Sequence, residues 1–403
     1  MSTPYIIILG ASADQIPMYE KARRNGIKTI GIDYNPIAPA LKFCDIPLVV
    51  SAKHVEQVIE SLTELKTQGI EFIGVTTLGM EISPIVAKVA KEFDLIAVSE
   101  STAHLTTNKC SRSYMLLANN IPVPKFQIVE RPSEIEMNLP FIIKPSDSSG
   151  SRGVRRVDFE EDIEDAFNNA ISYSSDSRVL LEELLQGPQI SIEGFMLNSK
   201  MYVTGFADRN YLPSNPINPQ FIENGGQVPS ELPYDIQRQA EEVFEAAALA
   251  LGITNGPSKG DLIVVNGKVI VIEITSRLSG GGFCSRVQPM QNGTDIVTAT
   301  LQWAAGMEVD KNLLLHQHTM YIAHRYYLHD DGVVTAINGL DKVATMPGVT
   351  DFIQVYDLKV GDILEPLTYI NRLFYVVTCS EKSIEDALKL ANDAIKTIDI
   401  QVK

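Results

Sequence analysis

A lysine that is followed at once by a loop of glycines and small hydroxyl residues is the first pattern that could do chemistry. Residues 140–144 form a short apolar run that ends on Lys144, and the segment Ser148–Val154 is rich in Ser and Gly. Such a loop can bring backbone N–H groups close to phosphate oxygens while the lysine supplies a point charge. A strand-end lysine before a solvated hairpin loop would explain the same residues. The lysine precedes the glycines, so this is not a Walker loop.

Two carboxylates are spaced to face each other across a hairpin. Residues 259–274 contain two β-rich runs joined by Asn266-Gly267, a strong hairpin signal, so Asp261 and Glu273 can lie opposite each other. A Glu inside an apolar run is costly to bury unless a positive group pairs with it. Mg²⁺ bound by carboxylates and nucleotide phosphates would meet this need, and Mn²⁺ could take its place. An ion pair with Arg277 is the alternative.

A third apolar run ends in Glu182 and Glu183, turns at Gly187-Pro188 and continues through Gln189. The main chain of such a turn could present hydrogen-bond donors and acceptors to the edge of an adenine ring. Two solvent-facing acids at the end of a strand would explain the residues about as well.

The elements that must position these groups begin with alternating β-rich and amphipathic stretches in the first hundred residues. This alternation predicts parallel strands with crossover helices. The expected strands are 5–9, 29–33 and 72–76, and the expected helices are 15–25, 55–68 and 83–93. Gly10 and Asp33 leave a dinucleotide-binding unit open as an alternative, but the loop after the first strand lacks the second and third glycines of that fingerprint. We favour a tight strand-to-helix turn.

From about residue 106 the pattern changes and predicts a new domain. Strands are expected near 141–144, 179–183, 190–196, 259–265, 268–274, 319–327, 352–356 and 374–379, and helices near 109–119, 234–251 and 383–398. The polar segment 210–230 is rich in Pro and Asn and is predicted to be a loop that caps a small substrate.

Composition excludes several classes of protein. The 34 basic and 50 acidic residues give a net charge of −16, which would repel nucleic acid and anionic membranes. No run has the features of a signal peptide or the length of a membrane span, so we expect a cytoplasmic protein. The cysteines (Cys44, Cys110, Cys284 and Cys379) lie far apart, and the six histidines show no metal-binding spacing, so we interpret both sets as structural.

Taken in order, the motifs resemble the ATP-grasp superfamily over nearly the whole chain. The motifs are Asn108-Lys109, Ile121-Pro-Val-Pro124, Lys144 with its glycine loop, Glu182-Glu183 with Gly187, Asp261, and Glu273-Ile-Thr-Ser-Arg277. Carboxylate–amine ligases of the bacilysin-synthetase type are most similar, through Asn255-Gly-Pro-Ser258 and Arg277-Leu-Ser-Gly-Gly-Gly282. Purine-pathway ATP-grasp enzymes and carbamoyl-phosphate synthase are more distant.

The resemblance implies an α/β ATP-grasp fold with three parts. These are a Rossmann-like pre-ATP-grasp domain with a parallel sheet at 1–105, an ATP-grasp domain at 106–306 that is split near 185, and a C-terminal α+β domain at 307–403. The implied reaction joins an amino-acid-like carboxylate to an amine through an acyl phosphate and releases ADP and phosphate. The alternatives are a carboxylating or formylating enzyme of purine or carbamoyl metabolism and a non-catalytic ATP-binding protein.

The resemblance also assigns residues to ATP and to magnesium. The implied ATP-binding set is Lys109, Lys144, Ser149, Gly150, Ser151, Gly153, Glu182, Glu183, Leu185 and Gln189. The implied metal ligands are Asp261, Glu273 and Thr275, and the implied catalytic residues are Lys144 and Arg277. Two positions depart from the family pattern, because many members have Glu at the position of Gln189 and Asn at that of Thr275. An amide can still bind a ribose hydroxyl, whereas Thr is a poorer magnesium ligand.

The residues implied to contact the small-molecule carboxylate and amine are Arg209, Glu223, Glu81 and Arg277. An arginine suits a substrate carboxylate and a glutamate suits a substrate ammonium. For Arg209, Glu223 and Glu81, a plain surface residue is at least as good an explanation, whereas Arg277 is implied to steady the transferring phosphoryl group or the acyl phosphate. A homodimer is the default expectation for the assembly.

Overall fold

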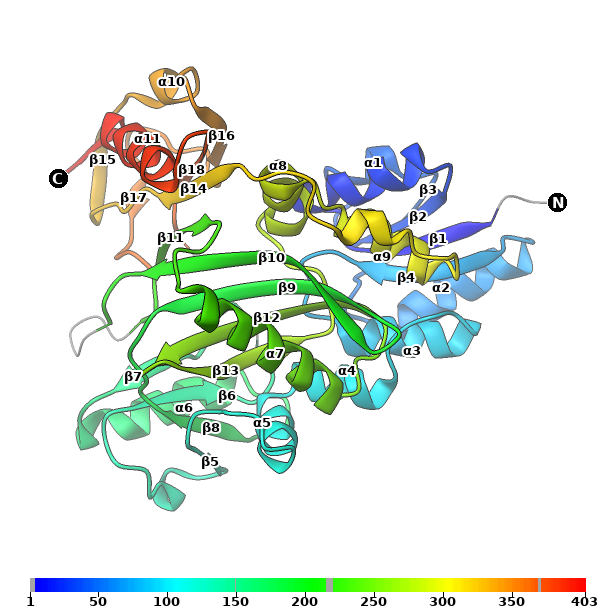
Figure 1. The fold of residues 1–403 in the computed structure, drawn as a ribbon, viewed down its shortest axis with the longest axis horizontal. Helices are drawn as coiled ribbons and strands as arrows, with labels where there is room; N and C mark the ends of the chain where they lie inside the picture. The colour runs from blue at the N-terminus through cyan, green and yellow to red at the C-terminus, as the bar shows by residue number, and fades with distance from the viewer. Residues whose placement is uncertain (1–3, 149, 215–219, 369–370) are drawn as a thin grey trace.

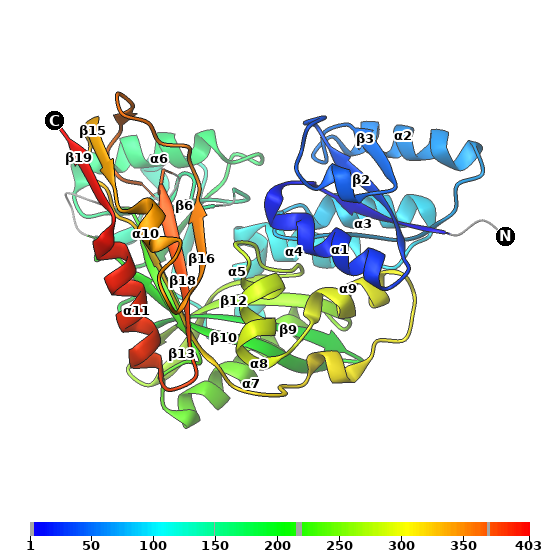
Figure 2. The same ribbon diagram turned by 90° about the horizontal axis from the view of Figure 1, so that it is seen from above.

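The computed structural model describes residues 4–148, 150–214, 220–368 and 371–403. In Figure 1 a long sheet occupies the centre, the N-terminal sheet and the C-terminal strands lie at opposite ends, and a small sheet lies beside the long one. Figure 2, turned by 90°, shows the same arrangement. The chain is therefore a mixed α/β protein in which the predicted N-terminal parallel sheet is confirmed.

The N-terminal sheet is parallel, with strand order β3-β2-β1-β4. Its strands are β1 (Tyr5–Leu9), β2 (Lys28–Asp33), β3 (Ile46–Val49) and β4 (Phe72–Thr77), and its helices are α1 (Ile16–Arg24), α2 (Val55–Thr67) and α3 (Ser83–Phe93). Both faces are buried: Ile6 and Ile8 belong to one core cluster, and Ile7 and Leu9 to another. A parallel strand covered on both faces reads as a continuous apolar run, which is why β1, β2 and β4 were predicted correctly. Strand β3, whose residues alternate between half-buried and exposed, was not predicted.

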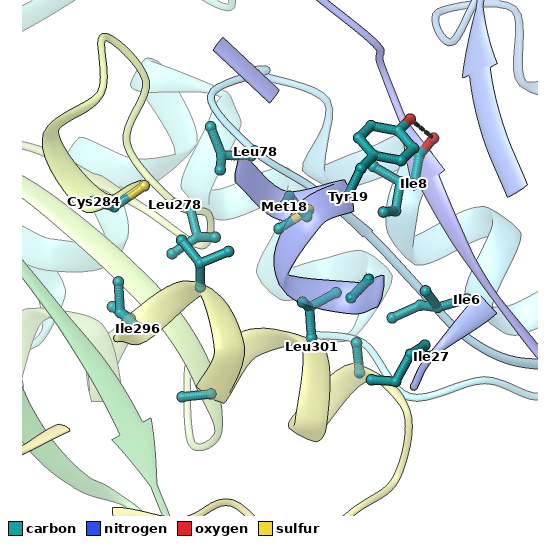
Figure 3. Close-up of a cluster of buried hydrophobic side chains, with 14 of the residues drawn as sticks. Ile6, Ile8, Met18, Tyr19, Ile27, Leu78, Leu278, Cys284, Ile296 and Leu301 are labelled. Atoms are coloured by element: carbon teal, nitrogen blue, oxygen red, sulfur yellow. Dashed lines mark hydrogen bonds between the residues drawn. The ribbon is translucent and has the colours of Figure 1, made fainter. Parts of the chain in front are cut away.

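Helix α9 (Ile296–Ala304), far along the chain, covers one face of this N-terminal sheet. Figure 3 shows Leu301 of α9 near Met18 of α1, with Ile6 of β1 on one side of them and Ile296 of α9 on the other, and all four belong to one core cluster. All four side chains are fully buried. The segment that follows the candidate site therefore packs against the first strands of the chain.

A small antiparallel sheet carries the predicted glycine loop. Its strand order is β5-β8-β6-β7, and it packs against α6. The elements are β5 (Phe126–Val129), β6 (Phe141–Pro145), β7 (Arg155–Val157), α6 (Ile163–Ser172) and β8 (Val179–Glu183), and they follow α4 (Glu100–Thr107) and α5 (Lys109–Ala118). Lys144 lies near the end of β6, and the loop joins β6 to β7.

The central sheet has eight strands in the order β13-β12-β9-β10-β11-β14-β18-β16. They are β9 (Gln189–Leu197), β10 (Lys200–Tyr211), β11 (Glu223–Val228), β12 (Gly256–Val265), β13 (Lys268–Thr275), β14 (Tyr321–Tyr326), β16 (Val349–Gln354) and β18 (Phe374–Ser380). Helix α7 (Tyr234–Ala250) packs on the β13 side, and α11 (Ile384–Thr397) packs on β14 and β18. The C-terminal strands β14, β18 and β16 thus continue the same sheet beyond β11.

One prediction fails in this sheet, because residues 223–228 form strand β11 instead of part of a capping loop. The sequence Glu-Asn-Gly-Gly-Gln-Val has little intrinsic preference for a strand. Its pairing with β10 on one side and β14 on the other compensates. At Gly225, which has φ +138°, a Cβ atom would lie 2.1 Å from the carbonyl oxygen of His324, so the close approach requires glycine.

The remaining C-terminal strands form a small sheet of order β17-β15-β19. They are β15 (Gly332–Asn338), β17 (Ile363–Leu364) and β19 (Asp399–Val402), and the short helix α10 (Leu340–Val343) follows β15. A π-helical turn at Phe283–Val287 leads into α8 (Gln288–Asn292). The four cysteines are free thiols. Within the described ranges, no helix combines the length and the apolar character needed to span a bilayer.

Candidate active site

A cavity of about 480 Å³ lies between the small sheet and the central sheet, and loops after β4 and β13 complete its wall. Most of the residues implied by the sequence line this one cavity. They are Glu81, Lys109, Lys144, Gly150, Ser151, Glu182, Glu183, Leu185, Gln189, Arg209, Asp261, Glu273 and Arg277. Residues spread over almost two hundred positions therefore meet in one place.

Two lysines provide positive charge at the small-sheet side. Lys144 donates a hydrogen bond from Nζ to Oε2 of Glu182, and both side chains are buried. Lys109, at the first position of α5, donates from Nζ to the carbonyl oxygen of Ser148 in the glycine loop. Burial lowers the pKa of Lys109, while Glu273 acts in the opposite direction. The two ammonium groups lie where phosphate oxygens could replace their present partners.

The glycine loop contributes only some of its predicted contacts. Gly150 and Ser151 line the cavity, whereas Ser149 lies outside the described residues. Gly153 does not line the cavity: it has φ +72°, and a Cβ atom there would lie 2.9 Å from the ring of Tyr173. Gly153 is therefore required for packing against α6, and its predicted role in binding ATP is not supported by its position.

An apolar slot lies beside the turn after β8. Glu183 accepts a hydrogen bond at Oε1 from the backbone N–H of Lys125, at 2.8 Å, which fixes the start of this turn. The apolar residues of the slot are Ile142, Val154, Leu185, Ile263 and Ile272. A flat aromatic base would fit between such side chains. Sequence reasoning missed Ile142, Ile263 and Ile272, because an isoleucine in a strand is expected in any core.

The predicted hairpin is confirmed, since Asp261 and Glu273 are direct cross-strand partners on β12 and β13. Glu273 forms an ion pair with Arg112, whose Nη2 lies 3.2 Å from Oε1. Burial alone would raise the pKa of Glu273, but Arg112, Lys109 and two further cations hold it well below its usual range. The predicted alternative of a Glu273–Arg277 ion pair is not what the structure shows, because Arg112 is the partner.

The second carboxylate, Asp261, has only a long ion-pair contact at one of its oxygens, since Arg209 Nη1 lies 3.9 Å from Oδ1. Lys259 Nζ lies 2.5 Å from Oδ2, and Oδ1 is buried without a hydrogen-bond partner among the described residues. In those residues no group of three or more His, Cys, Asp or Glu side chains could hold a metal by itself. Two carboxylates without a complete protein cage suit Mg²⁺, which usually keeps waters and phosphate oxygens among its ligands. The donor set fits this metal.

Thr275 does not belong to this group in the structure. Its side chain is buried, does not line the cavity, and has no hydrogen-bond partner for Oγ1 within the described ranges. Its carbonyl oxygen accepts a hydrogen bond from Ser258 Oγ at 3.1 Å. Of the three predicted metal ligands, Asp261 and Glu273 line the cavity, whereas Thr275 does not.

Arg277 and Glu81, both predicted to contact substrate, form an ion pair with each other. Nε of Arg277 donates to Oε2 of Glu81 at 2.7 Å, and Nη2 donates to the same oxygen. Burial lowers the pKa of Arg277, but Glu81 and other acids outweigh it and raise the pKa overall. The pair joins the segment after β13 to the loop after β4, where Gly79 donates from its backbone N–H to the carbonyl oxygen of Leu278 at 3.3 Å.

A second cavity of about 300 Å³ adjoins the first. The two share Gly79, Arg209, Lys259 and Arg277, so the common wall carries three cations. Lys259 was missed in the sequence, although it is two residues before Asp261 on a strand and therefore on the same face. Sequence spacing alone could have identified it.

Glu223 lies in the second cavity and not in the first. Its Oε1 is 2.9 Å from Arg209 Nε and 3.6 Å from His324 Nε2, and its Oε2 is 3.4 Å from Arg372 Nη1. Burial would raise the pKa of Glu223, but Arg209, His324 and Arg372 lower it to about 2. Burial lowers the pKa of Arg209, but nearby Tyr211, Glu223 and Asp261 outweigh it and raise the pKa overall.

Comparison with known proteins shows what this architecture is. Residues 137–286 match the model of the ATP-grasp domain. The fold is that of the L-amino acid ligase from Bacillus licheniformis, with a TM-score of 0.83, 20% identity and full coverage of both chains. The uncharacterized protein y4rH of Sinorhizobium fredii is 26% identical over 338 residues, which cover 82% of this chain and 68% of that protein.

A third similar protein is a D-alanine–D-alanine ligase of Desulforudis audaxviator, 25% identical over 185 residues. The match covers 43% of this chain and spans 58% of the length of that ligase. The predictions of an ATP-grasp fold and of an ATP-grasp domain are confirmed. The comparisons also support the predicted class of enzyme, a ligase that forms carbon–nitrogen bonds.

Proposed function

Because this chain has an ATP-grasp domain within an ATP-grasp fold, we propose that it joins a carboxylate to an amine through an acyl phosphate, at the expense of ATP. One observation carries the proposal. Arg209, Lys259 and Arg277 form the wall between a cavity suited to a nucleotide and a second cavity without the apolar slot. An anionic carboxylate and an anionic phosphate can approach each other only where cations offset their repulsion.

Within the first cavity, the proposed nucleotide contacts follow from the chemistry of the lining. Lys109 and Lys144 bind phosphate oxygens, and the turn after Glu183 meets the adenine edge. When bound, magnesium would be held by Asp261 and Glu273 and would neutralise phosphate charge. Lys259, the ion-pair partner of Asp261, lines both cavities and could turn toward the reacting groups.

The proposed chemistry has two steps. A carboxylate oxygen of the acid attacks the γ-phosphorus of ATP, the bond from that phosphorus to the bridging oxygen breaks, and ADP leaves. The nitrogen of the amine then attacks the acyl carbon, the bond from that carbon to the phosphate oxygen breaks, and the nitrogen loses a proton. Arg209, Lys259 and Arg277 stabilise the charge that moves along this path, so no protein nucleophile is needed.

The test is release of ADP and phosphate by the purified full chain with Mg·ATP and pairs of amino acids. Mass spectrometry of the product should show an amide that has lost one water relative to the two substrates. Parallel reactions with glycinamide and aminoimidazole ribonucleotides address the alternative function in purine metabolism. Turnover only with the ribonucleotides, or binding of ATP without turnover in any mixture, would rule out the ligase.

We further propose the domain limits at 105 and 306 that the sequence resemblance implies, a cytoplasmic location, and a homodimer, which is the default assembly. The substrates are proposed to be small molecules, because the two cavities have volumes of about 480 and 300 Å³.

A further inference from the structure

The floor of the second cavity changes in character along the central sheet. Strand pairing places Asp261, Ser191 and Ala207 in register across β12, β9 and β10. The same pairing places Val228 opposite Ile322 on β11 and β14. Ser191, Ala207, Val228 and Ile322 all line the cavity, so its floor is polar near the metal-site carboxylate and apolar farther away.

The distance along this floor matches the length of a small acid. Neighbouring strands are about 4.8 Å apart, so Val228 lies about 14 Å from Asp261, three strands away. With substrates bound, the transferred phosphoryl group and the reacting carboxylate would take up the first part of that span. The substituent of the acid therefore reaches the apolar part of the floor.

The roof above this apolar floor is apolar as well. Phe283 and Val287 lie four residues apart on the π-helical turn, and both line the cavity. They pack against the buried cluster formed by Ala207, Val228 and Ile322 and remain only partly buried themselves. Filling the remaining space with hydrocarbon would remove this apolar surface from water, which favours binding.

The charges around the cavity disfavour ionic substituents. Glu223 is the one carboxylate among the described lining residues, and three basic side chains already surround it. A lysine-like substituent at the apolar end would find no acid there, and an acidic one would be desolvated against hydrocarbon. Glu223 is already paired with Arg209, and as the resemblance implies it could also accept the ammonium group of an amino-acid-like substrate.

We propose that the acid which is activated carries an uncharged, apolar side chain, seated between Val228 and Ile322 on the sheet and Phe283 and Val287 above them. This inference rests on the proposed ligase activity. It names the chemical class of one substrate and the side chains that select it.

The first experiment measures kcat/KM for ADP release with a fixed amine and a series of acids. Alanine, 2-aminobutyrate, norvaline and methionine extend the apolar side chain stepwise, while asparagine, glutamate and lysine are polar or charged. Each added methylene should raise kcat/KM by about fourfold until the cavity is full. The kcat/KM for asparagine, glutamate or lysine should be at least about tenfold lower than that for the best apolar acid, because each of them would bury a polar or charged group without a partner.

The second experiment locates the selection in the cavity. Val287→Asp should lower kcat/KM for the best apolar acid at least about tenfold, because it places an acid in the apolar roof. The ratio of kcat/KM for that apolar acid to kcat/KM for lysine should therefore fall. Phe283→Ala should move the optimum to a longer side chain. Val360→Thr changes an exposed residue outside both cavities, so the kcat/KM values for all the acids should match those of the wild type. The KM for ATP should stay within about twofold of wild type in all three variants, because none of these residues lines the nucleotide cavity.

The two levels of the proposal can fail separately. If no acid supports ADP release by the wild-type chain, the proposed function itself is wrong. If ADP is released and polar or charged acids match or exceed the apolar series, the ligase stands and the selection for apolar acids is wrong. An apolar preference that is unchanged in both Val287→Asp and Phe283→Ala would also overturn it, because these side chains would then not form the selecting surface.

Discussion

Arg277 and Glu81 form an ion pair that ties the segment after β13 to the loop after β4, with Nε of Arg277 2.7 Å from Oε2 of Glu81. Their side chains are only 13% and 14% exposed. Arg277 also stands on the wall that the two cavities share. The N-terminal sheet therefore contributes directly to the position of a cation in the candidate active site.

We expect Glu81→Gln to lower both stability and turnover. The substitution leaves a buried guanidinium without its counter-charge, which should cost about 3–5 kcal/mol of unfolding free energy. The kcat for ADP release should fall at least about tenfold, while the KM for ATP changes less, because Arg277 faces the transferring group. Urea unfolding and steady-state kinetics measure the two effects.

The matched control is Glu56→Gln, which removes the acid of the exposed pair between Glu56 and Lys88, 2.9 Å apart. Exposed pairs contribute little, so the urea midpoint and kcat should match the wild type. Glu81→Gln with wild-type stability and turnover would show that the pair does not position Arg277.

The second prediction concerns the metal site. Glu273→Gln should abolish ADP formation, with a loss of at least about a thousandfold, while the far-ultraviolet circular dichroism stays that of the wild type. The reason is that the substitution removes negative charge from the proposed magnesium site. Binding of Mn²⁺, followed by electron paramagnetic resonance in the presence of ATP, should weaken in parallel.

Glu242→Gln provides the control, because Glu242 is an exposed residue on α7 that lines neither cavity. It should bind Mn²⁺ and turn over like the wild type. Wild-type turnover by Glu273→Gln would mean that the assignment of the metal site is wrong.

The sequence predicted the features of this site that depend on local structure. Asp261 and Glu273 were correctly placed opposite each other, because the Asn266-Gly267 turn sets the register of a hairpin within fifteen residues. Lys144 and the loop after it were predicted for the same reason, since an apolar strand followed by glycines is a short-range pattern.

The features that the sequence did not reveal depend on contacts between distant segments. The partner of Glu273 is Arg112, which is separated from it by 161 positions, and no local pattern indicates this choice. Residues 223–228 were taken for a loop because their composition is polar, yet β14, about a hundred residues later, turns them into a strand. The sequence indicated Glu223 as a candidate substrate contact. It did not indicate which cavity Glu223 lines or which three basic side chains surround it.

The third prediction is a loss of stability in acid that depends on Glu223. Its pKa is about 2 in the folded protein, against an ordinary value of 4.5. The unfolded chain therefore takes up the proton first as the pH falls. The stabilisation is fully present above about pH 5 and is lost between there and about pH 2. It is on the order of 3 kcal/mol for a shift of this size.

Urea unfolding of the wild type and of Glu223→Gln at several pH values measures this effect. The variant should be less stable at pH 7, and the difference should shrink steadily below pH 5, because the wild-type carboxyl also becomes neutral. Glu242→Gln should follow the wild-type curve. A difference between wild type and Glu223→Gln that does not change with pH would contradict the low pKa.

The last prediction concerns Glu193 on β9, a carboxylate with no exposed surface that lines neither cavity. It accepts hydrogen bonds from the backbone N–H and the hydroxyl of Ser279, both at 2.7 Å, and from Nε2 of Gln288 at 2.5 Å. Ser279 lies two residues after Arg277 and itself lines the second cavity. Glu193 thus holds the segment that carries Arg277 onto the central sheet.

We expect Glu193→Gln to lower kcat and raise the KM for the acid, because its new amide N–H₂ would face the Nε2 donor of Gln288. The unmade hydrogen bond should also cost about 1–3 kcal/mol of unfolding free energy. Adding Gln288→Glu restores an acceptor opposite a donor and should recover much of the lost activity, whereas Gln288→Glu alone places two carboxyl groups together and should be harmful. A Glu193→Gln variant that is destabilised but keeps the wild-type kcat and KM would show that Glu193 supports only the fold.

The double variant provides a second check. If its kcat does not exceed that of both single variants, the hydrogen bond between residues 193 and 288 does not position the Arg277 segment.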